Sequence, residues 1–303
     1  LDNDIKPVFK LTTTRGFEIQ ATANHIFLSG NNTEKKLGDF TIGDSIITMP
    51  GTPVNDLPYV KLNTTIDYDK GHGATNNGNR LNNVSLPEEL TEKLAYFIGY
   101  SFGDGYVERD SFKEPVRLDL ACSQEHPEIE TKLSNIATDL FAYSPHSSQG
   151  DGLVNKVSIH SKLLGLYLEQ NGLLKQKHNA LVMPEVIWKS RTSVQMAFIS
   201  GYFDADGYAS GSKKGYVIGS VCLPMLKDIQ QMLMSAGIVS RIFTEFRAGK
   251  EKTETWKDLH SLSITGAYSQ KAAIKLLSDS VKISNKAFIA KRDNLLTPFT
   301  AKD

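Results

Sequence analysis

The 303-residue sequence has only two cysteines, no excess of charge of either sign and no apolar run as long as a membrane span. So few cysteines exclude a disulfide-stapled scaffold and indicate a reducing compartment, so we expect a cytoplasmic protein. Basic and acidic residues number 34 each, which excludes a uniformly basic DNA-binding protein but not local basic patches. We expect no contact with membranes, since the N-terminus also lacks a signal-peptide pattern.

The charge that is present is unevenly distributed. Residues 1–90 contain 8 basic and 11 acidic residues, whereas residues 241–292 contain 11 basic and 5 acidic ones. The second stretch is either an ordinary solvated surface or a surface that faces phosphates, and composition alone does not choose between them.

The sequence repeats itself. Residues 95–107 read AYFIGYSFGDGYV and residues 197–209 read AFISGYFDADGYA, so the two Asp-Gly pairs lie 102 residues apart. After each copy follow strand-like and helix-like patterns in the same order. We therefore predict an α+β body with pseudo-twofold symmetry, antiparallel sheets and helices on one face. The predicted halves are residues 86–190 and 191–303.

The N-terminal part differs from this body. Residues 1–60 read as short alternating strands with turns at Arg15-Gly16, Gly30-Asn31 and Gly43-Asp44, which predicts a small all-β segment. Residues 61–85 are rich in asparagine and glycine, and we interpret them as a linker.

We predict that residues 94–104 and 196–206 are helices. Each copy has small residues four positions apart on one helical face, which lets two helix backbones approach closely. These residues are Gly99 and Gly103 in the first copy, and Gly201 and Ala205 in the second.

A carboxylate ends each predicted helix. Asp104 and Asp206 precede Gly105 and Gly207, which we expect to adopt the left-handed conformation that often follows a helix. A helix C-terminus carries partial negative charge, so two such carboxylates brought together would attract a cation. Oxygen ligands alone favour Mg²⁺, and a carboxylate-held metal site suits displacement at phosphorus. An isolated Asp-Gly is usually a turn, but its repetition favours a functional site.

FIGYSFGDG (97–105) and ISGYFDADG (199–207) resemble the LAGLIDADG motif of homing endonucleases, or meganucleases, and the resemblance covers about two-thirds of the chain. It implies that the motif helices form the interface between the halves, with saddle-shaped sheets in the DNA major groove. It also implies that Asp104 and Asp206 bind on the order of two or three divalent ions, with backbone carbonyls of Gly103 and Ala205 as secondary contacts.

The implied activity is Mg²⁺-dependent hydrolysis of both strands of a long, non-palindromic DNA site by a monomer. The resemblance also implies a lysine near each metal, which our alignment places at Ser123 and Val221. Neither is lysine, and Gln124, Lys213 and Lys214 are candidate replacements. The alternative interpretation is therefore a catalytically decayed DNA-binding or RNA-binding, maturase-like relative.

Basic residues on and beside the predicted strands are candidate DNA contacts, although each taken singly is an ordinary surface charge. The candidates are Arg109, Lys113, Arg117, Lys213, Lys214, Arg247, Lys250, Lys252 and Lys257.

A second resemblance concerns the N-terminal segment. ATANH (21–25) resembles the Thr-x-x-His block of intein splicing domains, and FTIGDSI (40–46) resembles the strand that follows it. Thr22 and His25 would then assist the first acyl shift of protein splicing, since histidine can donate a proton to a leaving group.

The sequence starts with Leu1-Asp2 and ends with Ala301-Lys302-Asp303, without the residues found at intein junctions, so we expect no splicing from it. A splicing element with a non-functional insert is a third interpretation.

Overall fold

The computed structural model describes residues 6–66, 84–150, 152–175, 180–211, 215–247 and 257–285. Most of the Asn/Gly-rich linker lies outside these ranges. So do four of the candidate DNA contacts, namely Lys213, Lys214, Lys250 and Lys252.

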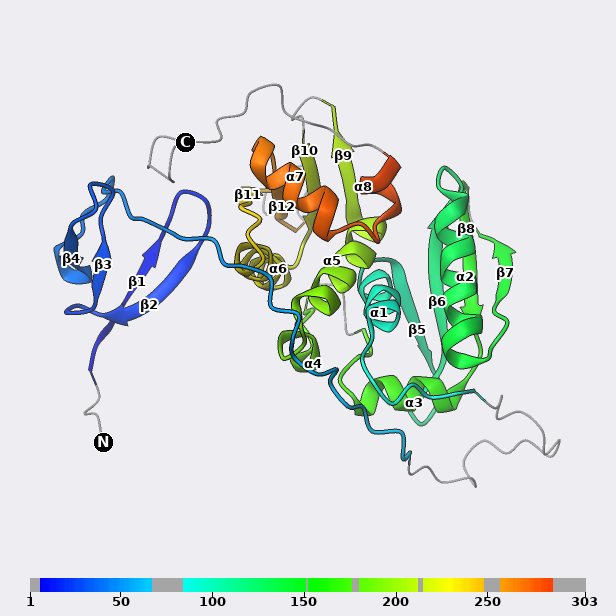
Figure 1. Ribbon diagram of the computed structural model, residues 1–303. Helices are drawn as coiled ribbons and strands as arrows, with labels where there is room; N and C mark the ends of the chain where they lie inside the picture. The colour runs from blue at the N-terminus through cyan, green and yellow to red at the C-terminus, as the bar shows by residue number, and fades with distance from the viewer. Residues whose placement is uncertain are drawn as a thin grey trace.

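Two units of the same build make up the body (Figure 1). The first contains α1 (Glu92–Asp104), β5 (Gly105–Arg109), β6 (Pro115–Ser123), α2 (Pro127–Phe141), β7 (His146–Gln149), β8 (Val154–Ile159) and α3 (Lys162–Gln170). The second contains α5 (Thr192–Asp206), β9 (Gly207–Ser210), β10 (Gly215–Ser220), α6 (Leu223–Ser235), β11 (Arg241–Glu245), β12 (Leu259–Ile264), α7 (Ala267–Leu276) and α8 (Val281–Asn285). The short helix α4 (Glu185–Trp188) lies between them.

Each unit forms a four-stranded sheet with the same strand order. The orders are β5-β6-β8-β7 and β9-β10-β12-β11, and every pairing is antiparallel. Figure 1 shows α1 and α5 side by side at the centre of the molecule, with one sheet on each side of the pair. The α+β fold class that the sequence repeat predicted is confirmed, because the repeat recurs as matched topology.

The central helix pair is packed backbone against backbone. A side chain at Gly99 would overlap the carbonyl oxygen of Phe198, and one at Gly201 would overlap the carbonyl oxygen of Tyr96. Gly103 meets the Cβ of Ala205 in the same way further along. The small residues therefore allow the close approach that their spacing predicted, and both helices are buried on nearly all sides.

The predicted left-handed conformation of Gly105 and Gly207 is wrong. Their φ angles are −88° and −97°, in the extended region, because each glycine is also the first residue of a strand. Glycine is required there for space: a Cβ at Gly105 would overlap the carbonyl oxygen of Ser101, and one at Gly207 would lie 2.6 Å from that of Phe203. The chain thus passes from helix to strand without an intervening turn.

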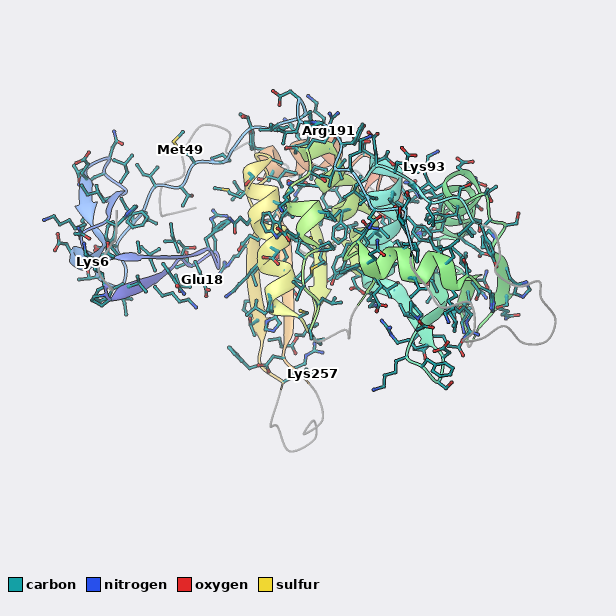
Figure 2. The ribbon with its side chains drawn as sticks, turned by 90° about the horizontal axis from the view of Figure 1, so that it is seen from below. Lys6, Glu18, Met49, Lys93, Arg191 and Lys257 are labelled. Carbon is teal, nitrogen blue, oxygen red and sulfur yellow. The ribbon has the colours of Figure 1, made fainter. Side chains whose placement is uncertain are left out.

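The N-terminal segment is all-β, as predicted. Strands β1 (Val8–Thr12) and β2 (Glu18–Thr22) form one hairpin, and β3 (Ile26–Leu28) and β4 (Glu34–Lys36) form another, followed by the short 3-10 helix η1 (Leu37–Asp39). The first hairpin contacts the second half of the body through the Glu18–Lys227 ion pair of 2.7 Å, and Figure 2 shows Glu18 on the side of the hairpin that faces α6.

Residues after the hairpins run along the body. The backbones of Val54 and Thr192 are joined by hydrogen bonds that involve the Thr192 amide and hydroxyl, and Tyr59 donates to Glu92 at the start of α1. None of the helices in the described part of the chain has the length and apolar character needed to cross a membrane.

Candidate metal centre between the paired helices

Two carboxylates meet where the paired helices end. Asp104 is the last residue of α1 and Asp206 is the last residue of α5, and both are partly buried. The two helix ends are close together: a Cβ atom added to Gly103, the neighbour of Asp104, would lie 3.4 Å from the carboxyl carbon of Asp206. The structure thus brings together the two acids that the sequence repeat singled out.

Burial and mutual repulsion act on these acids. Burial raises the pKa of Asp104, and burial together with the charge of Asp104 raises the pKa of Asp206 to about 6. The hydroxyl of Tyr202 opposes this shift by stabilising the charged form of Asp206. A carboxylate pair that is costly to ionise in this way is stabilised by an added cation.

Two lysines, which the sequence analysis missed, lie beside these acids. Lys175 follows α3 and donates through Nζ to the carbonyl of Gly103. Lys282, in α8, donates through Nζ to the carbonyls of Ala205 and Gly207, at 3.0 Å each. Burial lowers the pKa of both amines, and their charges in turn lower the pKa of both acids.

The repeat itself contained a signal for these lysines. Lys175 follows the last long helix of the first unit, and Lys282 follows the last long helix of the second. The alignment instead led to Ser123 and Val221, at the ends of the second strands. Gln124, considered there as a substitute, donates to Asn155 at 2.9 Å.

The donor set suits a hard divalent ion. Two carboxylates with the carbonyls of Gly103 and Ala205 provide only oxygen, as Mg²⁺ prefers, and Mg²⁺ commonly takes one or two carboxylates and completes its shell with water and phosphate. Both carbonyls already accept from a lysine, but a carbonyl oxygen has a second lone pair. Across the described ranges, no group of three or more His, Cys, Asp or Glu side chains is placed to hold a metal.

The candidate DNA contacts among the described residues lie in ion pairs or in loops, and Arg117 also bonds to the buried Asp119 at 3.0 Å. Arg109 pairs with Glu169 at 2.6 Å, Arg117 pairs with Glu108 at 2.7 Å, and Arg247 pairs with Glu245 at 2.6 Å. Pairs between partly exposed side chains contribute little to stability, so Arg109 and Arg247 can exchange their partners for phosphate, whereas Arg117 is held more firmly by the buried Asp119.

The two remaining candidates of this set lie in loops. Lys113 occupies a left-handed turn position, with φ of 65°, between β5 and β6. Figure 2 shows Lys257 on the side of the molecule away from Lys93 and Arg191, which mark the beginnings of the central helices.

The candidate splicing residues lie in the N-terminal segment. Thr22 ends β2 and donates to the Asn24 side chain at 2.6 Å, and its carbonyl accepts the backbone N–H of His25. The exposed His25 ring lies 4.9 Å from the ring of Phe27. Cys122, on β6, and Cys222, directly before α6, are both free and buried.

Comparisons with known proteins found a family match in the second half of the body and similar solved structures. Residues 193–277 match the LAGLIDADG-like domain family, so the chain contains a LAGLIDADG-like domain. A structure of the homing endonuclease I-DmoI in complex with DNA and Mn aligns over 65% of this chain and 99% of its own, with a TM-score of 0.46 and 19% identity.

Two curated relatives share a segment of the chain. The glutamine–fructose-6-phosphate aminotransferase of Methanocaldococcus jannaschii is 26% identical over 216 residues, which cover 71% of this chain and 18% of that protein. The ATP-dependent DNA helicase Hel308 of the same organism is 26% identical over 255 residues, which cover 80% and 17%. The chain thus spans less than a fifth of the length of either relative.

Proposed function

We propose that this protein is a site-specific, divalent-metal-dependent DNA endonuclease. The observation that carries the proposal is the symmetric centre, in which two carboxylates and two lysines converge at the ends of two matched helices. The match of residues 193–277 to the LAGLIDADG-like domain family supports it from the sequence. Phosphodiester hydrolysis needs negative charge stabilised at the phosphate and a water molecule activated nearby, and this centre offers groups for both tasks.

Each group in the centre has a role in this proposal. Asp104 and Asp206 would hold the divalent ions, with the carbonyls of Gly103 and Ala205 close by. When bound, the ions supply Lewis-acid stabilisation of the phosphate and a more acidic water. Lys175 and Lys282 carry positive charge beside the carboxylates, where they balance charge and can orient the attacking water or the phosphate.

The duplex would lie along the two sheets, where Arg109 and Arg247 form ion pairs with partly exposed acids that phosphate could replace. Because one chain carries both halves, it would act as a monomer. Because the halves differ in side chains, the site would be long and non-palindromic. The location would be cytoplasmic, where DNA is accessible to a protein with free cysteines.

We further propose that the nuclease is carried by an intein. The named activities of the two curated relatives, an aminotransferase and a DNA helicase, have nothing in common. A segment shared by such different proteins, covering less than a fifth of each, is better explained as an inserted element than as part of either activity. Thr22 and His25 in the all-β segment would then belong to the splicing centre. Restoring junction residues and flanking sequences and looking for ligated flanks would test this.

The test of the nuclease is cleavage of a randomised duplex library with Mg²⁺, Mn²⁺, Ca²⁺ or EDTA, followed by sequencing of the cut ends. We expect staggered cuts at one long motif with Mg²⁺ or Mn²⁺. Specific retention of a duplex without a cut in any metal would favour the decayed, DNA-binding alternative. Retention of single-stranded or structured RNA instead would favour the maturase-like one.

A further inference from the structure

Asp204, in the second half of the body, is a fully buried carboxylate that is distinct from the two candidate metal ligands. Both of its oxygens accept hydrogen bonds. Asp204 is 1% exposed, and its two oxygens accept four hydrogen bonds. One oxygen accepts from the Tyr96 hydroxyl at 2.6 Å and the Val281 backbone N–H at 2.8 Å. The other accepts from the Ser280 hydroxyl at 2.6 Å and the Lys282 backbone N–H at 3.0 Å.

These bonds tie down the segment that carries Lys282. The residue whose amide bonds to Asp204 is the residue whose amine reaches the carbonyls of Ala205 and Gly207 at 3.0 Å. Hydrogen bonds to a charged acceptor are about twice as strong as neutral ones. Asp204 therefore fixes the backbone from which Lys282 extends toward Asp206, two residues further along the same motif.

The anchor also crosses the interface between the halves. Tyr96 belongs to α1, in the first half, whereas Asp204 and Lys282 belong to the second. The ammonium of Lys132 in α2 lies 3.6 Å from the centre of the Tyr96 ring and donates to the carbonyl of Asp279. First-half residues thus hold both Asp204 and the start of the Lys282 segment.

The first half lacks this arrangement at the matching positions. In the repeat, Phe102 corresponds to Asp204 and Phe198 corresponds to Tyr96. The two phenyl rings pack edge to face with centroids 5.6 Å apart. A phenyl ring offers no carboxylate to the segment of Lys175, which follows the buried residues Leu173 and Leu174.

We propose that Asp204, held by Tyr96, is a positioning residue for Lys282, so that, among the described residues, this lysine is anchored through the interface and Lys175 has no matching carboxylate. The consequence for catalysis rests on the proposed endonuclease function. The consequence for the mobility of the Lys282 amine does not, because it follows from the contacts alone.

The first measurement needs no DNA. Brief acetylation followed by mass spectrometry gives the reaction rates of the Lys282 and Lys175 amines in one sample. In Asp204→Asn we expect Lys282 to react several times faster than in the wild type, with Lys175 unchanged, because an amide cannot reproduce the four accepted bonds. Tyr96→Phe removes a single donor and should give a smaller change in the same direction. Asp139→Asn, an exposed carboxylate paired with Lys93, is the matched control and should change neither rate.

The second measurement follows each DNA strand separately in single-turnover cleavage. Lys282→Met identifies the strand that depends on this lysine. Asp204→Asn should slow the same strand about tenfold or more and leave duplex affinity and the other strand nearly unchanged, so nicked product accumulates. A purely structural defect would instead slow both strands and weaken binding.

The outcomes separate the two proposals. Unchanged Lys282 acetylation in both Asp204→Asn and Tyr96→Phe overturns the positioning role, whether or not DNA is cut. Equal slowing of both strands overturns its strand-specific part. If the wild type cuts no duplex while Asp204→Asn still exposes Lys282, the endonuclease proposal fails and the anchoring contact stands. If Asp204→Asn does not fold, Tyr96→Phe carries the same comparison with one bond removed, and Ser280→Ala carries it with the bond to Asp204 and the bond from the Ile283 N–H removed.

Discussion

The two halves of the body have the same strand order and the same helix-to-strand junction. The buried side chains that pack next to each junction, on α1 and α5, differ. In both halves an aspartate ends the central helix, a glycine starts the strand and a lysine bonds to a carbonyl in or beside the junction. Behind this layer, Phe102 and Phe198 form an apolar contact on one side, whereas Asp204 and Tyr96 form a hydrogen bond on the other.

The difference shows which features the symmetry requires. Groups that face the shared centre are kept in both copies, as the proposed endonuclease function requires, because each copy would then present the same chemistry there. Groups one layer behind need only fill the space between α1, α5 and the neighbouring helices, and an aromatic pair or a buried acid with bonded donors can both do so. The groups of the candidate site are thus duplicated, whereas the residues packed behind them are not.

The strongest test of this comparison removes the shared acids. Asp104→Asn and Asp206→Asn should each lower double-strand cleavage at least about a thousandfold, since each takes away a charged ligand from the proposed metal site. Single-turnover cleavage with Mg²⁺ measures the loss, and Asp139→Asn serves as the exposed carboxylate control. Retained cleavage in both variants would remove these residues from the catalytic centre.

A second test concerns the packing that brings the halves together. Gly99→Ala and Gly201→Ala should each destabilise the protein by about 3 kcal/mol or more, because the added methyl overlaps a backbone carbonyl that cannot move without separating the helices. Denaturant unfolding measures the change in the free energy of unfolding. Gly211→Ala, where the added methyl meets open space, should change it little. Similar effects at all three positions would mean that close approach is not what requires glycine.

The lysines should distinguish the halves from each other. Lys175→Met and Lys282→Met should each slow cleavage about ten- to a hundredfold, the size expected for a positioned charged group, and each should do so mainly on its own strand. Strand-specific labels report which nick accumulates. Accumulation of the same nicked strand in both variants would show that the two lysines do not serve separate half-sites.

Much of this arrangement follows from the sequence, because the repeat is a local pattern that appears twice. The helices, the antiparallel strands and the two acids all follow from residues within a short window of each Asp-Gly. The wrong prediction, a left-handed Gly105 and Gly207, came from treating each helix as if it ended in a loop, whereas a strand begins at the glycine itself. The glycine was required for space, which a sequence pattern does not distinguish from required dihedral freedom.

The lysines and the Asp204 anchor were missed for another reason. Lys175 lies 72 positions along the chain from Gly103, and Lys282 lies 77 positions from Ala205. The repeat places a lysine after the last long helix of each unit, but no spacing rule links these positions to the Asp-Gly motifs, and only the folded topology shows that they meet there. Tyr96 and Asp204 meet because α1 and α5 pack at one register, which depends on the backbone contacts at Gly99 and Gly201.

The acids also predict a pH dependence. The pKa of Asp206 is raised to about 6 from its ordinary value of 3.8, so the folded protein binds this proton more tightly than the unfolded chain does. The metal-free protein should therefore lose stability as the pH rises through this interval, and Mg²⁺ should stabilise it at pH values above about 6 but not below about 4. Thermal unfolding across this range measures both effects.

The same titration sharpens the comparison between the acids. In Asp104→Asn the midpoint should move below 6, because the charge of Asp104 contributes to the shift in the pKa of Asp206. In Asp206→Asn the contribution from this group should disappear. A midpoint that Asp104→Asn leaves unchanged would show that the two carboxylates do not interact.

The smallest expected effect concerns the N-terminal segment, whose first hairpin contacts the second half of the body. Glu18 lies between Lys227 at 2.7 Å and Lys10 at 2.9 Å, on partly exposed side chains. Glu18→Gln should lower the free energy of unfolding by about 0.5 kcal/mol or less, since such surface pairs contribute little. The Arg15 carbonyl still accepts hydrogen bonds from the Gln230 side chain in α6 and from the Ile242 backbone N–H in β11. Limited proteolysis of the hairpin should change as little as global stability does. A marked increase in hairpin cleavage with unchanged global stability would instead show that this ion pair holds the segment on the body.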